Sequence, residues 1–217
     1  MVAVTAQPIG VIVNSDSHIN YWCQAYGLHE IAVPPSPQDY AFGQFVQVAL
    51  PAVAGVTPGE RLIGVIYDTV LVNPAFGTLG PRLSTSDEQR AVFSPDYLTE
   101  RATLLKILAL GTMDAAGSRV AHGVPPLALE LGAVVAPLAD AEVRAFHIFA
   151  DHAPPGGDEP YLHMGYLPQM ISERSGLLQQ AALHVLDRLR HLLPEHQRML
   201  GVVQRNLAWK LSVETTG

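Results

Sequence analysis

Nine histidines are the residues of this 217-residue chain with the clearest capacity for chemistry. Imidazole nitrogens bind zinc, and nearby carboxylates would complete such a site. His184 and His191 are seven residues apart, about 10 Å along a helix axis, which is too far for one ion without other ligands. We therefore expect loop or surface histidines, and a metal-dependent enzyme stays open only if the histidines converge. The closest groupings are Asp16 with His18, His147 with Asp151 and His152, His184 with Asp187 and His191, and His191 with His196.

Other catalytic signatures are missing from the sequence. There is no Gly-x-x-x-x-Gly-Lys-Ser/Thr loop to hold phosphates and no Gly-x-Ser-x-Gly turn to present a nucleophilic serine. The two lysines, Lys106 and Lys210, fall inside an expected strand and an expected helix. We therefore expect a non-catalytic protein without a cofactor.

The net charge of −7 is unevenly distributed along the chain. Residues 1–60 contain no Lys or Arg, so the aromatic group of Tyr21, Trp22 and Tyr26 lacks the basic partners of a site for single-stranded nucleic acid. The segment from Tyr161 onward is mildly basic, and a solvated helical face is its plainer interpretation. If DNA is contacted, the candidate residues are Arg188, Arg190, Arg198 and Arg205.

The single cysteine, Cys23, excludes an intrachain disulfide and any site with several cysteine ligands, and we expect it to be a small buried side chain. The N-terminus lacks the charged flank and apolar run of a signal peptide. No stretch approaches the 18 or so apolar residues of a membrane span. We therefore expect a cytoplasmic protein with no membrane contact.

Most of the first 150 residues read as β-structure. Residues 43–50 alternate polar and apolar side chains with a period of two, which indicates a half-buried strand. Gly64 lies inside a long apolar run and predicts a bulge or the bend of a closing barrel. Ser94 and Pro95 would begin a short helical turn, residues 111–123 read as a turn-rich connection, and residues 140–147 as a short helix. Expected strands are 8–13, 20–26, 43–50, 61–73, 104–110 and 127–135.

A linker rich in Pro and Gly at residues 151–160 divides the chain into an expected barrel domain, 1–150, and an expected helical hairpin, 161–217. Beyond the linker the apolar period changes to about 3.6, and Pro194 separates two amphipathic helices. Each helix needs an apolar surface to cover its stripe, so these stripes are the predicted interface for self-association or docking. Their residues are Leu178, Val185, Leu189, Leu200, Val203, Leu207 and Leu211.

Several strand and glycine patterns resemble the HAS barrel, the small β-barrel of HerA-type DNA translocases and of ATP synthase α and β subunits. The residues that carry the resemblance are Ile9-Gly10-Val11-Ile12, residues 43–48, Ile63-Gly64-Val65-Ile66, residues 106–111, and the end from Pro125-Pro126 through Gly132 to Phe146. The resemblance implies a mainly β protein with α, a small closed β-barrel followed by a C-terminal helical hairpin. Those proteins carry an ATPase domain after the barrel, whereas this chain carries a hairpin, so the implied role is packing in a ring and docking of partners.

Three functions are therefore open from the sequence. The leading hypothesis is a non-catalytic assembly or adaptor protein, a homo-oligomer that docks a protein partner such as a HerA-type ATPase or a nuclease. The second is an accessory factor in DNA processing with a HerA/NurA-type machine. The third is the metal-dependent enzyme that uses clustered histidines.

Overall fold

The computed structural model describes residues 7–28, 30–51, 58–73, 102–149, 161–172 and 176–214. Its strands are β1 (Gly10–Ser15), β2 (Asn20–Ala25), β3 (Phe45–Ala49), β4 (Arg61–Val72), β5 (Ala102–Met113), β6 (Val120–His122), β7 (Val134–Pro137), β8 (Ile148–Phe149) and β9 (Tyr161–Leu162). Its helices are α3 (Asp140–His147), α4 (Leu167–Ser172), α5 (Gly176–Leu192) and α6 (Gln197–Glu214), with the 3₁₀ turn η1 (Pro194–His196) before α6.

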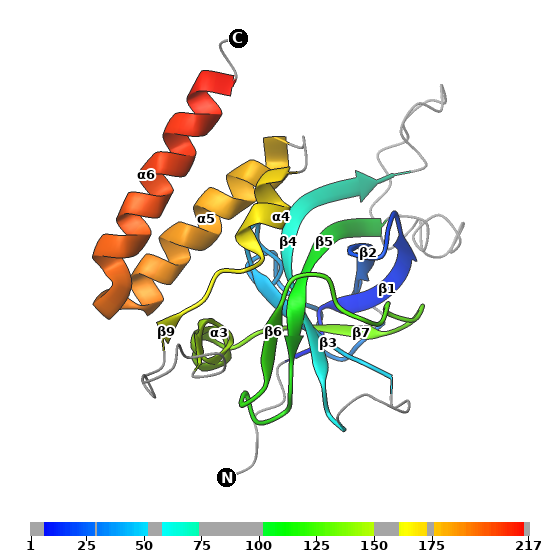
Figure 1. Ribbon diagram of the computed structural model, residues 1–217. Coiled ribbons are helices and arrows are strands. Elements are labelled where there is room, and N and C mark those ends of the chain that lie inside the picture. Colours follow the sequence, from blue (N-terminus) through cyan, green and yellow to red (C-terminus); the bar gives the residue numbers. More distant parts are fainter. Residues whose placement is uncertain are drawn as a thin grey trace, which may run out of the picture.

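Six antiparallel strands close into a barrel. The hydrogen-bonded order is β2-β1-β7-β3-β4-β5, and β5 pairs again with β2, which completes the ring, while β6 extends the sheet from β5. Closure leaves few strand edges unpaired, so a small barrel is stable without a second sheet. The fold is mainly β with α, a closed β-barrel followed by helices, and the fold class predicted from the sequence is confirmed (Figure 1).

Residues 62–67 of β4 and 107–113 of β5 are buried on both faces of the sheet, which explains the nearly continuous apolar sequences there. In β5, Leu105 and Ile107 point into the barrel interior and pack with Cys23 and Val135. The alternate side chain Leu108 belongs to a second hydrophobic core, which also contains buried side chains of the C-terminal helices. The wall formed by β4 and β5 is therefore apolar on its outside as well, and the helices cover it.

Gly64 marks a bulge, as the sequence predicts. The pairing of β4 with β5 shifts register between Ile63 and Gly64. A Cβ atom at position 64 would lie 2.7 Å from Cγ2 of Ile107 and 2.9 Å from the carbonyl oxygen of Leu108, so no larger residue fits here without moving β5. The bend allows the long β4 to pair with β3 at one end and follow β5 along its whole length.

Two predicted segments are wrong. Residues 127–133 form a loop instead of a strand, and only Val134–Pro137 pairs, because Gly132 adopts a left-handed φ of +81° that turns the chain immediately before β7. Residues 111–123 are not all connection: β5 continues to Met113 and β6 returns along it. The helical turn predicted at Ser94 and Pro95 lies outside the described residues.

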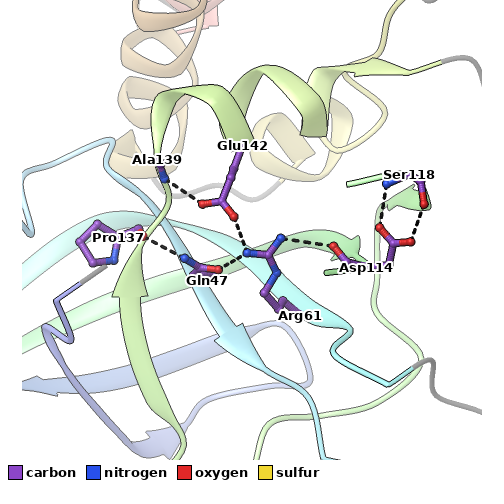
Figure 2. A network of polar contacts seen from close by, with 7 residues as sticks. All are labelled: Gln47, Arg61, Asp114, Ser118, Pro137, Ala139 and Glu142. Atoms are coloured by element: carbon purple, nitrogen blue, oxygen red, sulfur yellow. Dashed lines mark hydrogen bonds and ion pairs between the residues drawn. The ribbon is translucent and has the colours of Figure 1, made fainter. Parts of the chain in front are cut away.

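Arg61 fixes α3 to the end of the barrel (Figure 2). Its Nη1 donates to the side-chain oxygen of Gln47 and to Glu142 on α3, and its Nη2 donates to the carbonyl oxygen of Asp114 at 3.2 Å. The other oxygen of Glu142 accepts the backbone N–H of Ala139 at 3.2 Å and so caps the helix. This network connects β3, β4 and the turn after β5 to α3, and its role is structural.

The helices after the barrel are stacked outward in layers. Figure 1 shows α5 between the barrel and α6, with α6 outermost. α5 packs on β4 and α4, and α6 packs on α5. α4, β8 and β9 are elements that the sequence does not predict. The linker predicted at 151–160 lies outside the described residues, while the described segments on its two sides share one hydrophobic core.

Candidate interaction surface

The inner face of α5 lies against the barrel. Leu178, Val185 and Leu189, three of the predicted interface residues, have no exposed surface, and they belong to the core that includes Phe45 and Val65 of the barrel wall. The sequence shows an amphipathic stripe on this helix but not what covers it. The structure shows that the chain's own barrel does.

The predicted stripe of α6 is also covered within the chain. Leu200, Leu207 and Leu211 are at most 9% exposed in the same core, and Val203 packs against it in a half-buried position. These side chains therefore join α6 to α5. As a result, the seven predicted interface residues all stabilise the monomer, and any docking on this helix must use other side chains.

A second apolar stripe lies on another side of α6, turned by about 120° around the helix axis from the first, and we call it the outer stripe: Met199, Val202, Asn206, Trp209 and Val213. Four of its side chains are apolar and 46%, 47%, 70% and 53% exposed, and Asn206 between them is exposed too. Their spacing of three and four residues places all five on one side of the helix. The same spacing is that of the a and d positions of a coiled-coil seam.

The four arginines predicted as nucleic-acid contacts have different environments. Arg188 holds α5 to the barrel: it donates to Gln44 at 2.9 Å and to Asp140 at 2.8 Å, and its guanidinium lies 5.6 Å from the ring centre of Phe45. Arg190 is half-buried and donates to Gln204 of α6 at 2.9 Å. The remaining pair, Arg198 and Arg205, is exposed.

Arg198 and Arg205 border a hollow of about 520 Å³ between the end of α5 and the first turns of α6. Gly201 leaves room in the hollow: a Cβ atom at that position would meet only Nε of Arg190, at 3.9 Å. That Nε is buried and has no hydrogen-bond partner among the described residues. The complete lining is Arg190, Gln197, Arg198, Gly201, Val202, Gln204 and Arg205, which makes it basic.

A smaller hollow of about 320 Å³ lies where α5 meets the barrel. Several of its lining side chains already have partners: Arg188 is bonded to Gln44, and the His184 ring packs edge-on against Phe42 with 5.2 Å between ring centres. His184 and Asp187, which the sequence groups together, both line it. Its lining contains no serine, threonine or cysteine that could act as a nucleophile beside His184, so this hollow suggests no catalytic role.

Two of the histidines have structural roles, His147 inside the core and the half-buried His122 beside it. His147 is fully buried; its Nδ1 donates to the carbonyl oxygen of Val143 at 2.6 Å, so Nε2 accepts the hydroxyl of Tyr166 at 2.7 Å. His122 likewise donates through Nε2 to Phe146 at 2.8 Å and accepts the N–H of Gly165 at 3.0 Å. Burial lowers the pKa of His147 to about 3 and that of His122 to about 4, so both rings are neutral at pH 7.

These bonds occupy both nitrogens of each ring, which leaves neither ring free to bind a metal. Within the described ranges, no three His, Cys, Asp or Glu side chains come together in a way that could hold an ion. Asp151 and His152, grouped with His147 in the sequence, lie outside those ranges. Cys23 is buried in the barrel interior, as predicted, and burial raises the pKa of its thiol to about 12.

Residues 3–216 match the model of a family described as a domain of unknown function, DUF8166. The chain belongs to this family. Because the match extends from before β1 to beyond the end of α6, the barrel and the helices fall within one DUF8166 domain. None of the curated proteins matches the chain. Among the helices that the structure describes, none is both long and apolar enough to cross a membrane.

The sequence prediction for this DUF8166 chain misses the outer stripe. Its five positions follow a regular pattern of three and four residues, but the leucine stripe of α6 is stronger and Asn206 interrupts the apolar residues. The signal that could have found it is Trp209, a large apolar side chain outside the leucine stripe and 70% exposed in the structure. A helix with apolar residues on two faces has two surfaces to cover.

Proposed function

We propose that this protein is a non-catalytic assembly or adaptor protein that docks through the outer stripe of α6. The barrel, held together by two hydrophobic cores, serves as a rigid platform, and α5 attaches α6 to it. In this arrangement α6, the helix that carries the docking surface, is the outermost helix of the molecule (Figure 1).

The observation that carries this proposal is the exposure of four apolar side chains along one side of a single helix. Single exposed apolar residues are ordinary, but four of them along one side of a helix, among them a tryptophan exposed to 70%, are typical of a surface that another protein covers. Tryptophan is also enriched among residues that dominate binding energy at interfaces.

The resemblance to HAS barrels supports the same role, because those barrels pack laterally in rings and dock partners. On this proposal the protein self-associates or receives a protein partner such as a HerA-type ATPase or a nuclease. Its expected place of action is the cytoplasm.

The test is to compare the full chain with a Trp209→Ser variant and with Leu131→Ser as the matched control. Leu131 is 76% exposed and lies in the loop before β7, so its replacement removes an exposed apolar side chain that is not part of α6. Light scattering after size-exclusion chromatography measures self-association, and reconstitution with purified partners captured from cell extract measures docking. We expect Trp209→Ser to abolish an association that Leu131→Ser preserves.

An association that both variants preserve, or a chain that neither self-associates nor captures any partner through Trp209, would contradict the proposal. Deleting residues 161–217 is a poor substitute for this test, since it also removes half of a hydrophobic core and exposes the outer wall of β4 and β5.

The exposed pair Arg198 and Arg205 favours one second candidate, an accessory factor in DNA processing. That function requires DNA binding that persists at physiological salt and weakens when both arginines are replaced by glutamine. Replacing Arg188 is not informative here, because Arg188 is bonded to Gln44 and Asp140.

A further inference from the structure

We propose that the outer stripe of α6 receives an acidic amphipathic helix of a different protein, in preference to a second copy of α6. This inference rests on the proposed docking role and specifies the chemistry of the partner. It follows from the charges that border the stripe and from the hollow beside it.

The spacing of the outer stripe suits a helix as its partner. Met199, Asn206 and Val213 are seven residues apart, and Val202 and Trp209 fall between them, so the five correspond to alternating a and d positions over two heptads. Side chains at these positions insert between those of a facing helix. An extended peptide or a flat surface would not match a seam that follows the helix axis.

Three of the five positions that flank the stripe are basic, and a fourth, Val203, packs against the core. With the heptad positions assigned in this way, Arg198 and Arg205 occupy g positions and Lys210 occupies an e position. No carboxylate occupies an e or g position between residues 198 and 212. Charges at e and g positions select the partner and the orientation of paired helices. The stripe is therefore complementary to a helix with Glu or Asp along its flanks.

A second copy of α6 would be a poor occupant for the same reason. In a parallel pair, Arg205 would face Lys210 of the second copy, and in an antiparallel pair arginines would face arginines. Both arrangements place like charges beside a closing apolar seam, where repulsion is costly because water is being excluded. Asn206 in the middle of the stripe adds a requirement for a polar side chain at the matching position of the partner.

The hollow beside the stripe provides a place for a partner carboxylate. Val202 belongs to both the stripe and the hollow, so a helix seated on the stripe would have its flank above Gly201. There, Arg198 and Arg205 lie at the rim, and the Nε of Arg190, which has no partner among the described residues, lies buried. An Arg guanidinium binds a carboxylate through two parallel hydrogen bonds, which adds geometric selectivity to charge attraction.

Nucleic acid fits this surface less well. A phosphate backbone would contact the arginines but would leave Met199, Trp209 and Val213 without an apolar partner. A protein helix with one apolar side and acidic flanks satisfies both the stripe and the arginines.

The experiment measures binding of three dye-labelled helical peptides to the full-length protein by fluorescence anisotropy. Each peptide spans three heptads and has Asn at the central a position. The first peptide has Leu at the other a and d positions and Glu at the e and g positions. The second has Lys in place of every Glu, and the third keeps every Glu but has Ser in place of every Leu. Binding is compared for the wild type, Trp209→Ser and the double variant Arg198→Glu with Arg205→Glu. Unfolding in urea checks that each variant folds like the wild type.

We expect the wild type to bind the Leu and Glu peptide about ten-fold or more tightly than either of the others, with affinity falling as salt rises from about 0.05 to about 0.5 M. The charge-reversed double variant should prefer the Lys peptide, and Trp209→Ser should bind none. Equal binding of the Glu and Lys peptides, or displacement of the Glu peptide by duplex DNA at physiological salt, would overturn the inference.

The result also separates this inference from the proposed function. A wild-type chain that forms a dimer sensitive to Trp209→Ser, but binds no acidic peptide, would overturn the acidic partner and leave the docking role in place. A chain that shows neither Trp209-dependent dimerisation nor Trp209-dependent binding of a peptide or purified partner would overturn both.

Discussion

The helices α5 and α6 lie side by side and have similar lengths, 17 and 18 residues, yet they bury very different amounts of apolar surface. α5 has six buried side chains and lies between the barrel, α4 and α6, whereas α6 has three, Leu200, Leu207 and Leu211, and leaves its outer stripe open. Both sequences show one strong leucine stripe. Position in the stack decides which helix belongs to the core and which presents a surface.

The largest effect expected from this difference is on the free energy of unfolding. Leu189→Ala should lower it by about 3 kcal/mol, because Leu189 is fully buried between the barrel wall and the helices and its loss leaves a cavity. Urea unfolding followed by circular dichroism measures the change. Leu177→Ala on the same helix is the control, since Leu177 is 45% exposed, and it should cost well under 1 kcal/mol. Equal costs would contradict the buried position of α5.

The core beneath the helices should also make the protein sensitive to acid. The pKa of His147 lies near 3 in the folded chain and near 6.5 when unfolded, so the unfolded state binds a proton first as pH falls. Stability is then full above about pH 6.5 and is lost as pH falls towards 3; at pH 5 His147 alone should lower the free energy of unfolding by about 2 kcal/mol. His122 acts in the same direction.

Urea unfolding at pH 7 and pH 5 measures this loss, and NMR titration of the imidazole C–H signals identifies its source. The chemical shifts of His147 and His122 should keep the values of neutral imidazole rings from pH 7 down to pH 5. A normal titration of either ring near pH 6.5 would show that it is not buried as the structure places it.

A smaller effect should distinguish the arginines of the two helices. Arg188→Met should lower the free energy of unfolding by about 1 kcal/mol, because it removes hydrogen bonds from α5 to Gln44 and Asp140 while keeping an apolar stem over Phe45. Arg198→Met on α6 should change stability by less than about 0.5 kcal/mol, since its side chain is exposed. The opposite order, measured by urea unfolding, would show that Arg198 and not Arg188 holds the helices in place.

Much of the barrel could be predicted because its strands follow the physics of half-buried and fully buried sheets. Residues 43–50 contain β3, in which Phe45, Val46 and Val48 are buried and Gln47 is half-buried, and Gly64 indicated the bulge in β4. The prediction failed at residues 127–133, where the leucines at positions 127, 129 and 131 resemble one face of a strand, although Gly132 turns the chain. A sequence does not reveal the φ angle that a glycine will adopt.

The candidate surface could be predicted only in part, because burial depends on neighbours that are distant in the sequence. The stripe of Leu178, Val185 and Leu189 was recognised, but its partner is the outer wall of β4 and β5. The signal for that wall was the run Leu62–Tyr67, apolar at consecutive positions and therefore in need of cover on both faces. With that cover assigned to α5, the outer stripe of α6 would have remained as an apolar stripe without a partner.

The smallest expected effect lies on α6 and raises stability. Gly201→Ala should increase the free energy of unfolding by about 0.5–1 kcal/mol, because alanine favours a helix and the added Cβ would meet only Nε of Arg190, at an ordinary contact distance of 3.9 Å. Urea unfolding measures the gain. The comparison substitution Gly64→Ala, in the crowded bulge of β4, should instead destabilise the chain. A loss of stability at position 201 would show that the hollow between α5 and α6 is closed and that the open face of α6 is smaller than the outer stripe.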